Sequence, residues 1–340
     1  MDLLSRLAAS RMVRVGVAVV AVAALVVSAT LLLRGGKEAA PPPPPATEPT
    51  APPTTPAPTT PPPTTTPPPP ETQPPPPTAE PTPPPPAAVP FSWSSAGAFV
   101  WHETDVEPTL LGRTLREAGF GWVAVRLQDG TEEDPVEADW VYRFRLASGL
   151  PVGGWGVLRT DPEGEAALAS ALVTRYGLDF YVANPEVEYE FSGADGPSDE
   201  RSGRSSRFVT AFRNLRPSPF PLGLSSYCRP DHHDIDWSAW RRGRAAFLPQ
   251  AYVNDIGTEG SPPACVIGSR GVFPPSDIHP TIGMHIGVHG TVDVPTYVEL
   301  LARAGTVGFS VYLAETRMTD ADWRELGAAI DQRRIAKRPG

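Results

Sequence analysis

Strand-like and helix-like segments alternate eight times between residues 98 and 333, and this alternation limits the fold more than any other feature. The expected strands are residues 98–102, 122–127, 152–158, 178–190, 221–227, 247–254, 281–289 and 307–314. The helices expected between and after them are residues 108–118, 135–148, 162–176, 204–215, 237–244, 295–304 and 320–333, with an irregular or short helical segment at 263–273. Alternating βα units indicate parallel strands. We therefore expect an α/β protein with a (β/α)8 TIM-type barrel; an open doubly wound sheet is the alternative, although it needs fewer repeats.

Residues 41–90 consist mostly of Pro and Thr and contain almost no large apolar side chains, so they cannot bury a core. A polyproline II chain extends by about 3.1 Å per residue, so this stretch could span on the order of 150 Å. We expect a disordered spacer, because the rival use of P-x-x-P segments as docking sites is mostly cytoplasmic. The expected organisation is a cytoplasmic N-terminus at 1–14, a transmembrane helix at 15–33, a Pro/Thr-rich linker at 34–90, the barrel at 91–334 and a basic tail at 335–340.

Residues 15–33 carry no charge and match the length of a bilayer span. Arg6, Arg11 and Arg14 precede them, which favours a cytoplasmic N-terminus. A cleaved signal peptide is the alternative, but its apolar region would be shorter. We expect a single-pass cell-membrane protein whose barrel is extracytoplasmic.

The composition excludes several functions. The net charge of −9 and the lack of a basic stretch with aromatic residues argue against nucleic acid. C-x-x-C and H-E-x-x-H do not occur, so we expect no metal site and no cofactor. The run from His232 to Asp236 could chelate a metal, but a solvated loop is the simpler interpretation.

The two cysteines, Cys228 and Cys265, follow the fifth and sixth expected strands. We therefore expect them on the same rim of neighbouring units. They can form a disulfide if their Cα atoms lie within about 7 Å, and they remain free thiols if the loops splay further apart.

Polar residues alternate along the segment LDFYVANPEVEYE at 178–190, where Asn184, Glu186, Glu188 and Glu190 are spaced two apart. On an extended strand they would share one face, with successive positions roughly 6.6 Å apart. Two carboxylates that flank a glycosidic bond need a separation of about 5 to 9.5 Å. The pattern favours glycoside chemistry; a polar strand end exposed to water is the alternative.

The second expected strand places Arg126 on the face opposite Val123, Val125 and Leu127. A charge against the helix layer would be costly, so Arg126 should point into the barrel. We expect it to form a structural ion pair there, with Glu186 as the partner.

Active sites of this fold lie at the carboxyl ends of the strands. Carboxylates there can move protons, amides can bind hydroxyl groups and aromatic rings can stack on sugars. The candidate catalytic residues are Glu186, Glu188 and Asp129, and the candidate substrate-binding residues are Asn184, Tyr227, Gln250, Tyr252 and Tyr312. Packing in the lumen is an alternative role for Tyr252 and Tyr312.

Four segments, LQDGT at 127–131, NPEVEYE at 184–190, LGLSSYCRP at 222–230 and FLPQAY at 247–252, resemble bacterial glycoside-hydrolase-like barrels related to the family 25 lysozymes. That family carries D-x-E at the end of strand four, with the Glu as general acid. By position Glu186 matches this acid, whereas Asn184 stands where the Asp is expected. The Asp of the family's first strand has no counterpart in FVWHETD at 99–105.

The resemblance implies a glycosidase that acts on a cell-wall or envelope glycan such as peptidoglycan. Glu186 would be the general acid, with its pKa raised by burial and by Glu188, and Glu188 or Asp129 would assist water or stabilise the cationic transition state. The alternative is a non-catalytic glycan-binding or surface-scaffold barrel, which Asn184 favours, because an amide is neither a base nor an anionic nucleophile. An unrelated barrel enzyme is a third hypothesis.

Overall fold

The computed structural model describes residues 88–101, 103–134, 136, 139–192, 196–306, 308–314 and 318–336, all within a compact unit at Thr78–Gly340. The expected cytoplasmic segment 1–14, the transmembrane helix 15–33, nearly all of the linker 34–90 and most of the tail 335–340 lie outside the described residues. Among the helices in the described ranges, none is both long and apolar enough to cross a membrane.

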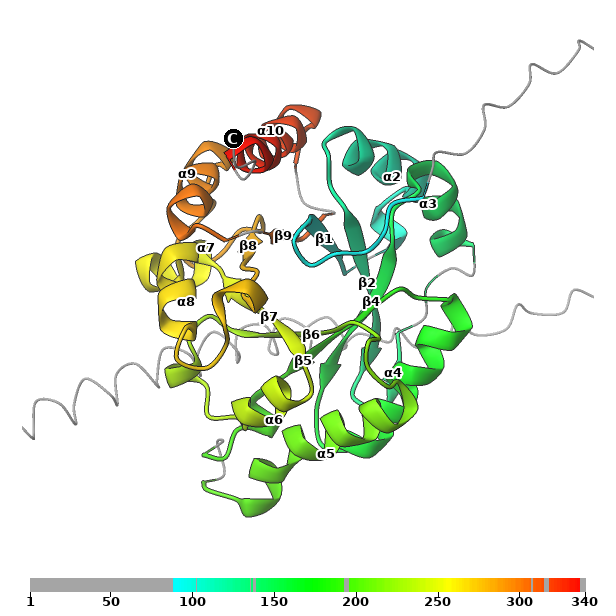
Figure 1. The fold of residues 1–340 in the computed structure, drawn as a ribbon, viewed down its shortest axis with the longest axis vertical. Helices are drawn as coiled ribbons and strands as arrows, with labels where there is room; N and C mark the ends of the chain where they lie inside the picture. Colours follow the sequence, from blue (N-terminus) through cyan, green and yellow to red (C-terminus); the bar gives the residue numbers. More distant parts are fainter. Residues whose placement is uncertain are drawn as a thin grey trace, which may run out of the picture. The chain divides into compact units, whose positions relative to one another are not determined.

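Eight parallel strands form a closed barrel (Figure 1). They are β1 (Ala96–Val100), β2 (Trp122–Asp129), β4 (Val152–Leu158), β5 (Tyr181–Pro185), β6 (Leu222–Tyr227), β7 (Ala245–Ala251), β8 (Thr281–Gly283) and β9 (Phe309–Tyr312). Each strand pairs with its neighbour in the sequence of parallel strands, and β1 pairs with both β2 and β9. A two-residue strand, β3 (Glu132–Glu133), adds an antiparallel hairpin to β2. The expected α/β barrel is confirmed.

Helices form the outer ring around these strands (Figure 1). They are α2 (Pro108–Glu117), α3 (Trp140–Ser148), α4 (Pro162–Tyr176), α5 (Asp199–Leu215), α6 (Trp237–Arg242), α7 (Val253–Ile256), α8 (Pro262–Ser269), α9 (Val294–Ala304) and α10 (Asp320–Ala336). Short 3-10 turns occur at η1 (Glu103–Asp105), η2 (Val187–Tyr189), η3 (Pro230–His232), η4 (Gly257–Gly260) and η5 (Pro275–Asp277). Local signals set several boundaries; for example, the Asp161 side chain accepts a hydrogen bond from the Gly164 amide at the start of α4.

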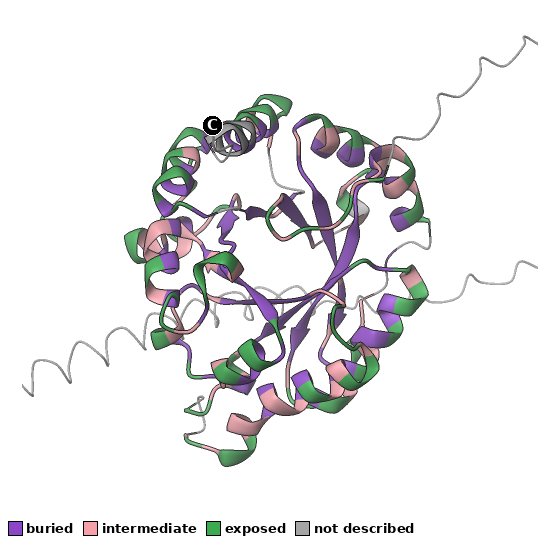
Figure 2. Ribbon diagram, in the orientation of Figure 1, coloured by how far each residue is buried: buried purple, intermediate pink, exposed green. Residues whose placement is uncertain are grey.

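Alternate residues of each strand face two different apolar layers. Val123 and Val125 of β2 belong to the layer between strands and helices, whereas Trp122 and Ala124 belong to a cluster in the lumen. Figure 2 shows the corresponding pattern, with buried strands inside and helices exposed on their outer faces. Gly153 allows this lumen packing, because a Cβ there would lie 2.2 Å from the Phe180 ring. The lumen is thus a packed core rather than a channel.

The fourth barrel strand is shorter than expected, and this corrects the predicted placement of its acidic residues. β5 ends at Pro185, and η2 begins two residues later. Proline has no N–H for the strand ladder, and the amides of Tyr189 and Glu190 instead turn back to the carbonyls of Glu186 and Val187. The alternating carboxylates therefore do not lie on one face of a strand.

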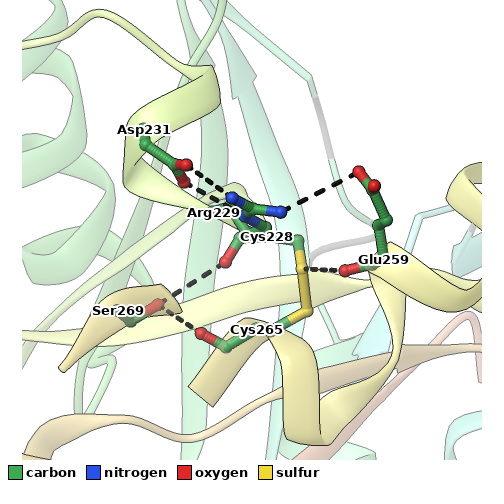
Figure 3. Close-up of a disulfide and its surroundings, with 6 residues drawn as sticks. All are labelled: Cys228, Arg229, Asp231, Glu259, Cys265 and Ser269. Atoms are coloured by element: carbon green, nitrogen blue, oxygen red, sulfur yellow. Dashed lines mark hydrogen bonds and ion pairs between the residues drawn. A yellow bond between two sulfur atoms is a disulfide. The ribbon is translucent and has the colours of Figure 1, made fainter. Parts of the chain in front are cut away.

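The disulfide joins Cys228, which follows β6, to Cys265 in α8 (Figure 3). Their Cα atoms lie 4.9 Å apart, and both side chains are fully buried. The Ser269 hydroxyl donates a hydrogen bond to the Cys265 carbonyl oxygen at 2.6 Å, and it lies 3.5 Å from the Cys228 carbonyl oxygen. The segments that follow β6 and β7 therefore approach each other on one rim. The sequence alone could not decide between this disulfide and two free thiols.

We expect Cys228→Ser/Cys265→Ser to lower the free energy of unfolding by about 3–4 kcal/mol, because the bond closes a loop with a sequence separation of 37. Urea denaturation would measure the loss. The double variant should be insensitive to a reductant that destabilises the wild type by a similar amount. Equal stability of the wild type and the variant under oxidising conditions would contradict this prediction.

Candidate functional site

A chain of amide hydrogen bonds holds Glu186 at the carboxyl end of β5. The Asn184 side-chain amide donates to Glu186 Oε1 at 2.7 Å. Gln250 of β7 donates in turn to Asn184 Oδ1 at 3.1 Å, and it reaches the Ser225 hydroxyl of β6 at 3.4 Å. Three neighbouring strands thereby orient one carboxyl group. The structure brings Asn184, Glu186 and Gln250 together.

The environment of Glu186 favours its protonated form. Burial is the largest influence and raises the pKa of Glu186, and the charges of Glu188 and Asp129 raise it further. Arg159 and the hydrogen bond from Asn184 act in the opposite direction, but the pKa remains above the usual value for Glu. A carboxyl group with a raised pKa can serve as a proton donor.

Arg159, which sequence reasoning missed, connects the candidate carboxylates. It follows β4 directly, and its Nε lies 2.8 Å from Asp129 Oδ1. Its Nη1 lies 3.5 Å from Glu188 Oε1. Burial lowers the pKa of Arg159, but the hydrogen bond to Asp129 and the charges of Asp129, Glu188 and Glu186 outweigh this and raise it. The sequence could have indicated Arg159, because it directly follows an expected strand, and Asp129 was chosen as a candidate for the same reason.

Arg126 lies beside the candidate site, but its ion pairs differ from the expected one. Its guanidinium pairs with Asp129 at 2.8 Å and with Asp134 at 3.1 Å, rather than with Glu186. It also lies 5.2 Å from the centroid of the Trp101 ring. The β2–β3 hairpin causes the difference, because it returns Asp134 alongside the end of β2.

A wall of aromatic rings forms another part of the barrel mouth. Tyr252 and Tyr312 stack with their ring centroids 5.5 Å apart, and the Trp101 ring follows Tyr312 at 6.3 Å. Burial raises the pKa of Tyr252 well above its usual value, and Glu186 is among the charges that contribute. Tyr252 and Tyr312 therefore pack against each other in the mouth, and Tyr252 lies close enough to Glu186 to feel its charge. Trp101 was missed because β1 ends at Val100, whereas the expected strand continued to residue 102.

Tyr227 occupies a different environment from the other predicted substrate-binding residues. Its ring lies 6.0 Å from that of His232 in η3. Burial raises its pKa, followed by the charge of Glu259, while Arg229 lowers it. Among the described residues, no hydrogen bond, ion pair or ring contact joins Tyr227 to Glu186. The structure therefore does not bring Tyr227 to the carboxylate cluster.

Glu190 contacts a buried histidine; burial raises the pKa of Glu190, and the charges of Asp234 and Glu186 raise it further. His233 Nε2 lies 3.1 Å from Glu190 Oε1, and His233 Nδ1 lies 2.6 Å from the Ser226 hydroxyl. Burial lowers the pKa of His233 to about 4, although Asp234 acts in the opposite direction. The interpretation of this run as a solvated loop was therefore wrong for His233. Within the described residues, no group of three His, Cys, Asp or Glu side chains is arranged to hold a metal ion.

A hollow of about 320 Å³ adjoins the cluster at the β2–β3 hairpin. Its walls include Trp101, Arg126 and Asp129, together with the acidic residues that follow β2. Asp129 lines the hollow and also pairs with Arg159, so the hollow borders the carboxylate cluster.

Glu165, a fully buried residue in the first turn of α4, supports the cluster from below. Its Oε1 accepts a hydrogen bond from the Arg159 amide at 2.6 Å, and its Oε2 accepts one from the Tyr189 hydroxyl at 2.5 Å. One carboxylate therefore fixes the backbone of Arg159 and the turn that carries Glu188.

We expect Glu165→Ala to lower the free energy of unfolding by about 2–4 kcal/mol, because each orphaned buried donor costs roughly 1–3 kcal/mol. Chemical denaturation would measure the change. Glu163→Ala is the matched control, since Glu163 lies in the same turn but is 56% exposed and pairs with Arg207. The control should lose less than about 1 kcal/mol. Equal losses would contradict a special role for Glu165.

Comparisons with known proteins give fold relatives only. The sequence matches no family model and no curated protein. A chitinase from Rhizomucor miehei is similar in structure, with a TM-score of 0.55 and 11% identity over 69% of this chain and 99% of that chain. A family GH18 chitinase from Cycas revoluta has a TM-score of 0.52 and 9% identity, over 70% of this chain and 99% of that chain. A class V chitinase from Nicotiana tobaccum has a TM-score of 0.51 and 8% identity, over 69% of this chain and 98% of that chain.

All three structures are chitinases, so they do not support the resemblance to the family 25 lysozymes. At these identities the likeness concerns the fold and not the activity. The chain is a (β/α)8 barrel similar in fold to glycoside hydrolases.

Proposed function

We propose that the protein hydrolyses a glycan that contains N-acetylglucosamine, with Glu186 as the general acid. The main support for this proposal is the environment of Glu186. Its pKa is raised, and it lies next to Asp129 and Glu188, which form ion pairs with Arg159. Two further observations support the proposal. Aromatic rings line the same mouth, and related folds have been solved with (GlcNAc)3 and NAG4 bound.

The hydrogen bonds around Glu186 assign its proton. Oε1 accepts the N–H of Asn184, so in the protonated acid the hydrogen resides on Oε2. Oε2 donates this proton to the glycosidic oxygen as the bond to the anomeric carbon breaks. Water then adds its hydroxide to that carbon and returns a proton to Glu186, which balances the reaction.

The other residues stabilise the positive charge that develops on the sugar ring. Asp129 and Glu188 supply negative charge, and the ion pairs with Arg159 hold both side chains in place. Asn184 replaces the expected Asp, and it orients the acetamido group of the sugar through its amide. The stacked Tyr252 and Tyr312 provide an apolar surface for a sugar face.

We further propose that the glycan belongs to the cell wall or envelope, with peptidoglycan as the leading substrate. The uncharged segment 15–33 supports a single-pass membrane anchor, and the proline-rich linker supports a barrel held away from the membrane. The disulfide fits an oxidising, extracytoplasmic compartment.

Glu186→Gln should lower the release of reducing ends by at least about 100-fold, because the amide cannot donate the proton. The full-length chain would be assayed on chitin oligosaccharides and on purified peptidoglycan. Glu299→Gln is the matched control, since it makes the same change on α9 at a side chain that is 73% exposed. Activity of Glu186→Gln equal to that of the control would reject the assignment.

A second function, glycan binding without turnover, is favoured by Asn184. The amide forms hydrogen bonds to Glu186 and from Gln250, so it is built into the site. Co-sedimentation with insoluble peptidoglycan, without release of reducing ends and without sensitivity to Glu186→Gln, would select this function.

The pH dependence of hydrolysis provides a separate prediction. An acid must be protonated, so the rate should fall as pH rises through the pKa of Glu186, which lies above the ordinary value of 4.5. Arg159 lowers that pKa, so Arg159→Gln should move the basic limb of the kcat profile to higher pH. Arg303→Gln on α9 is the control, and its profile should match the wild type. A basic limb that stays in place in Arg159→Gln would contradict the electrostatic coupling.

A further inference from the structure

A second hollow lies on the outer wall of the barrel, between α5 and α6, which are neighbours in Figure 1. Its volume is about 270 Å³. Ser206, Thr210 and Asn214 line it from α5. They are spaced four residues apart, so their hydroxyl and amide groups lie along one face of the helix. One wall of the hollow is therefore a row of neutral hydrogen-bond donors.

Two arginines supply positive charge to the same hollow. Arg242 of α6 lines it with a side chain that is 63% exposed. Arg213 of α5 is half-buried, and its guanidinium is fixed by hydrogen bonds to the carbonyl oxygens of Gly243 at 2.8 Å and Phe220 at 2.7 Å. The carbonyls orient Arg213 but leave it without a neutralising carboxylate.

Basic side chains outnumber acidic ones around this hollow. None of the described residues that line it is acidic. Asp236 lies 3.6 Å from Arg242, and within the described part of the chain no ion pair is found for Arg213. Burial lowers the pKa of Arg213, and the charge of Arg244 lowers it further. The charge of Arg244 therefore adds to the positive potential at Arg213.

We propose that the hollow between α5 and α6 binds a phosphate group, either as the free ion or as part of a phosphodiester polymer. A tetrahedral phosphate presents several acceptor oxygens, which suits donors that approach from two helices. Arginine matches phosphate geometry, and the hydroxyl and amide groups of α5 add neutral contacts. A bound anion would also relieve the repulsion between Arg213 and Arg244.

The hollow is separate from the carboxylate cluster. It is lined by the second half of α5 and the end of α6, and Gly243 leads directly into the start of β7. Helices that follow barrel strands run back toward the amino ends of the strands, so this hollow lies toward the rim opposite Glu186. Phosphate binding and glycan hydrolysis can therefore be tested independently.

Calorimetric titration of the full-length chain at low ionic strength would test the proposal, with inorganic phosphate and poly(glycerol phosphate) as the two probes. We expect Arg242→Gln to weaken binding about tenfold, because a charge-assisted hydrogen bond is lost. Thr210→Val should weaken it by a smaller factor. Substitution of Arg213 is avoided, since it would also free the carbonyls of Gly243 and Phe220.

Arg113→Gln on α2 is the matched control, because it removes the same charge from an exposed position on another helix. Binding by this variant should equal that of the wild type. Tighter binding of the polymer would identify a phosphodiester source, and equal or tighter binding of inorganic phosphate would identify the free ion. An equal loss in Arg113→Gln and Arg242→Gln, or no phosphate binding by the wild type, would overturn the proposal.

Discussion

The closure of the sheet is the constraint on which the rest of this structure depends. The parallel pairing of β1 with both β2 and β9 leaves the eight-stranded cylinder without an open edge. All eight carboxyl ends then meet on one rim, and the polar residues that follow the strands converge there. The lumen below is filled by aromatic side chains; Phe91 and Trp93, which precede β1, pack against Phe180 with ring centroids 4.3 Å and 5.3 Å away. The site therefore rests on a rigid core.

On that rim, Arg159 forms ion pairs with two of the three carboxyl groups of the site, and the third, Glu186, is hydrogen-bonded to Asn184 instead. Arg159 forms ion pairs with Asp129 and Glu188, at 2.8 Å and 3.5 Å. Burial raises the pKa of Glu186, and the charges of Glu188 and Asp129 raise it further, against the opposing charge of Arg159. A carboxyl group of raised pKa beside carboxylates held in ion pairs is an arrangement that can serve as a proton donor. Glu165 sets this arrangement by holding the Arg159 backbone and the Glu188 turn.

Much of the architecture could be predicted from local patterns, but the partners within the site could not. The period-two alternation in β2 correctly separated Val123 and Val125 from Trp122 and Ala124, because strand geometry fixes which residues share a face. The same rule failed after Pro185, where the chain leaves the ladder and a turn replaces the strand. The two-residue strand β3 was missed as well, and with it the return of Asp134 that takes Arg126 away from Glu186.

The sequence by itself determined the eight βα units, the cap of α4 at Asp161 and the set of polar residues at the strand ends, since these follow from periodicity and from contacts within a few residues. Only the tertiary structure decided that Arg159 serves the carboxylates, that Tyr227 lies apart from them and that Cys228 meets Cys265. The reason is physical. Ion pairs, burial and disulfides depend on distances between residues far apart in the chain, and those distances exist only once the barrel has closed.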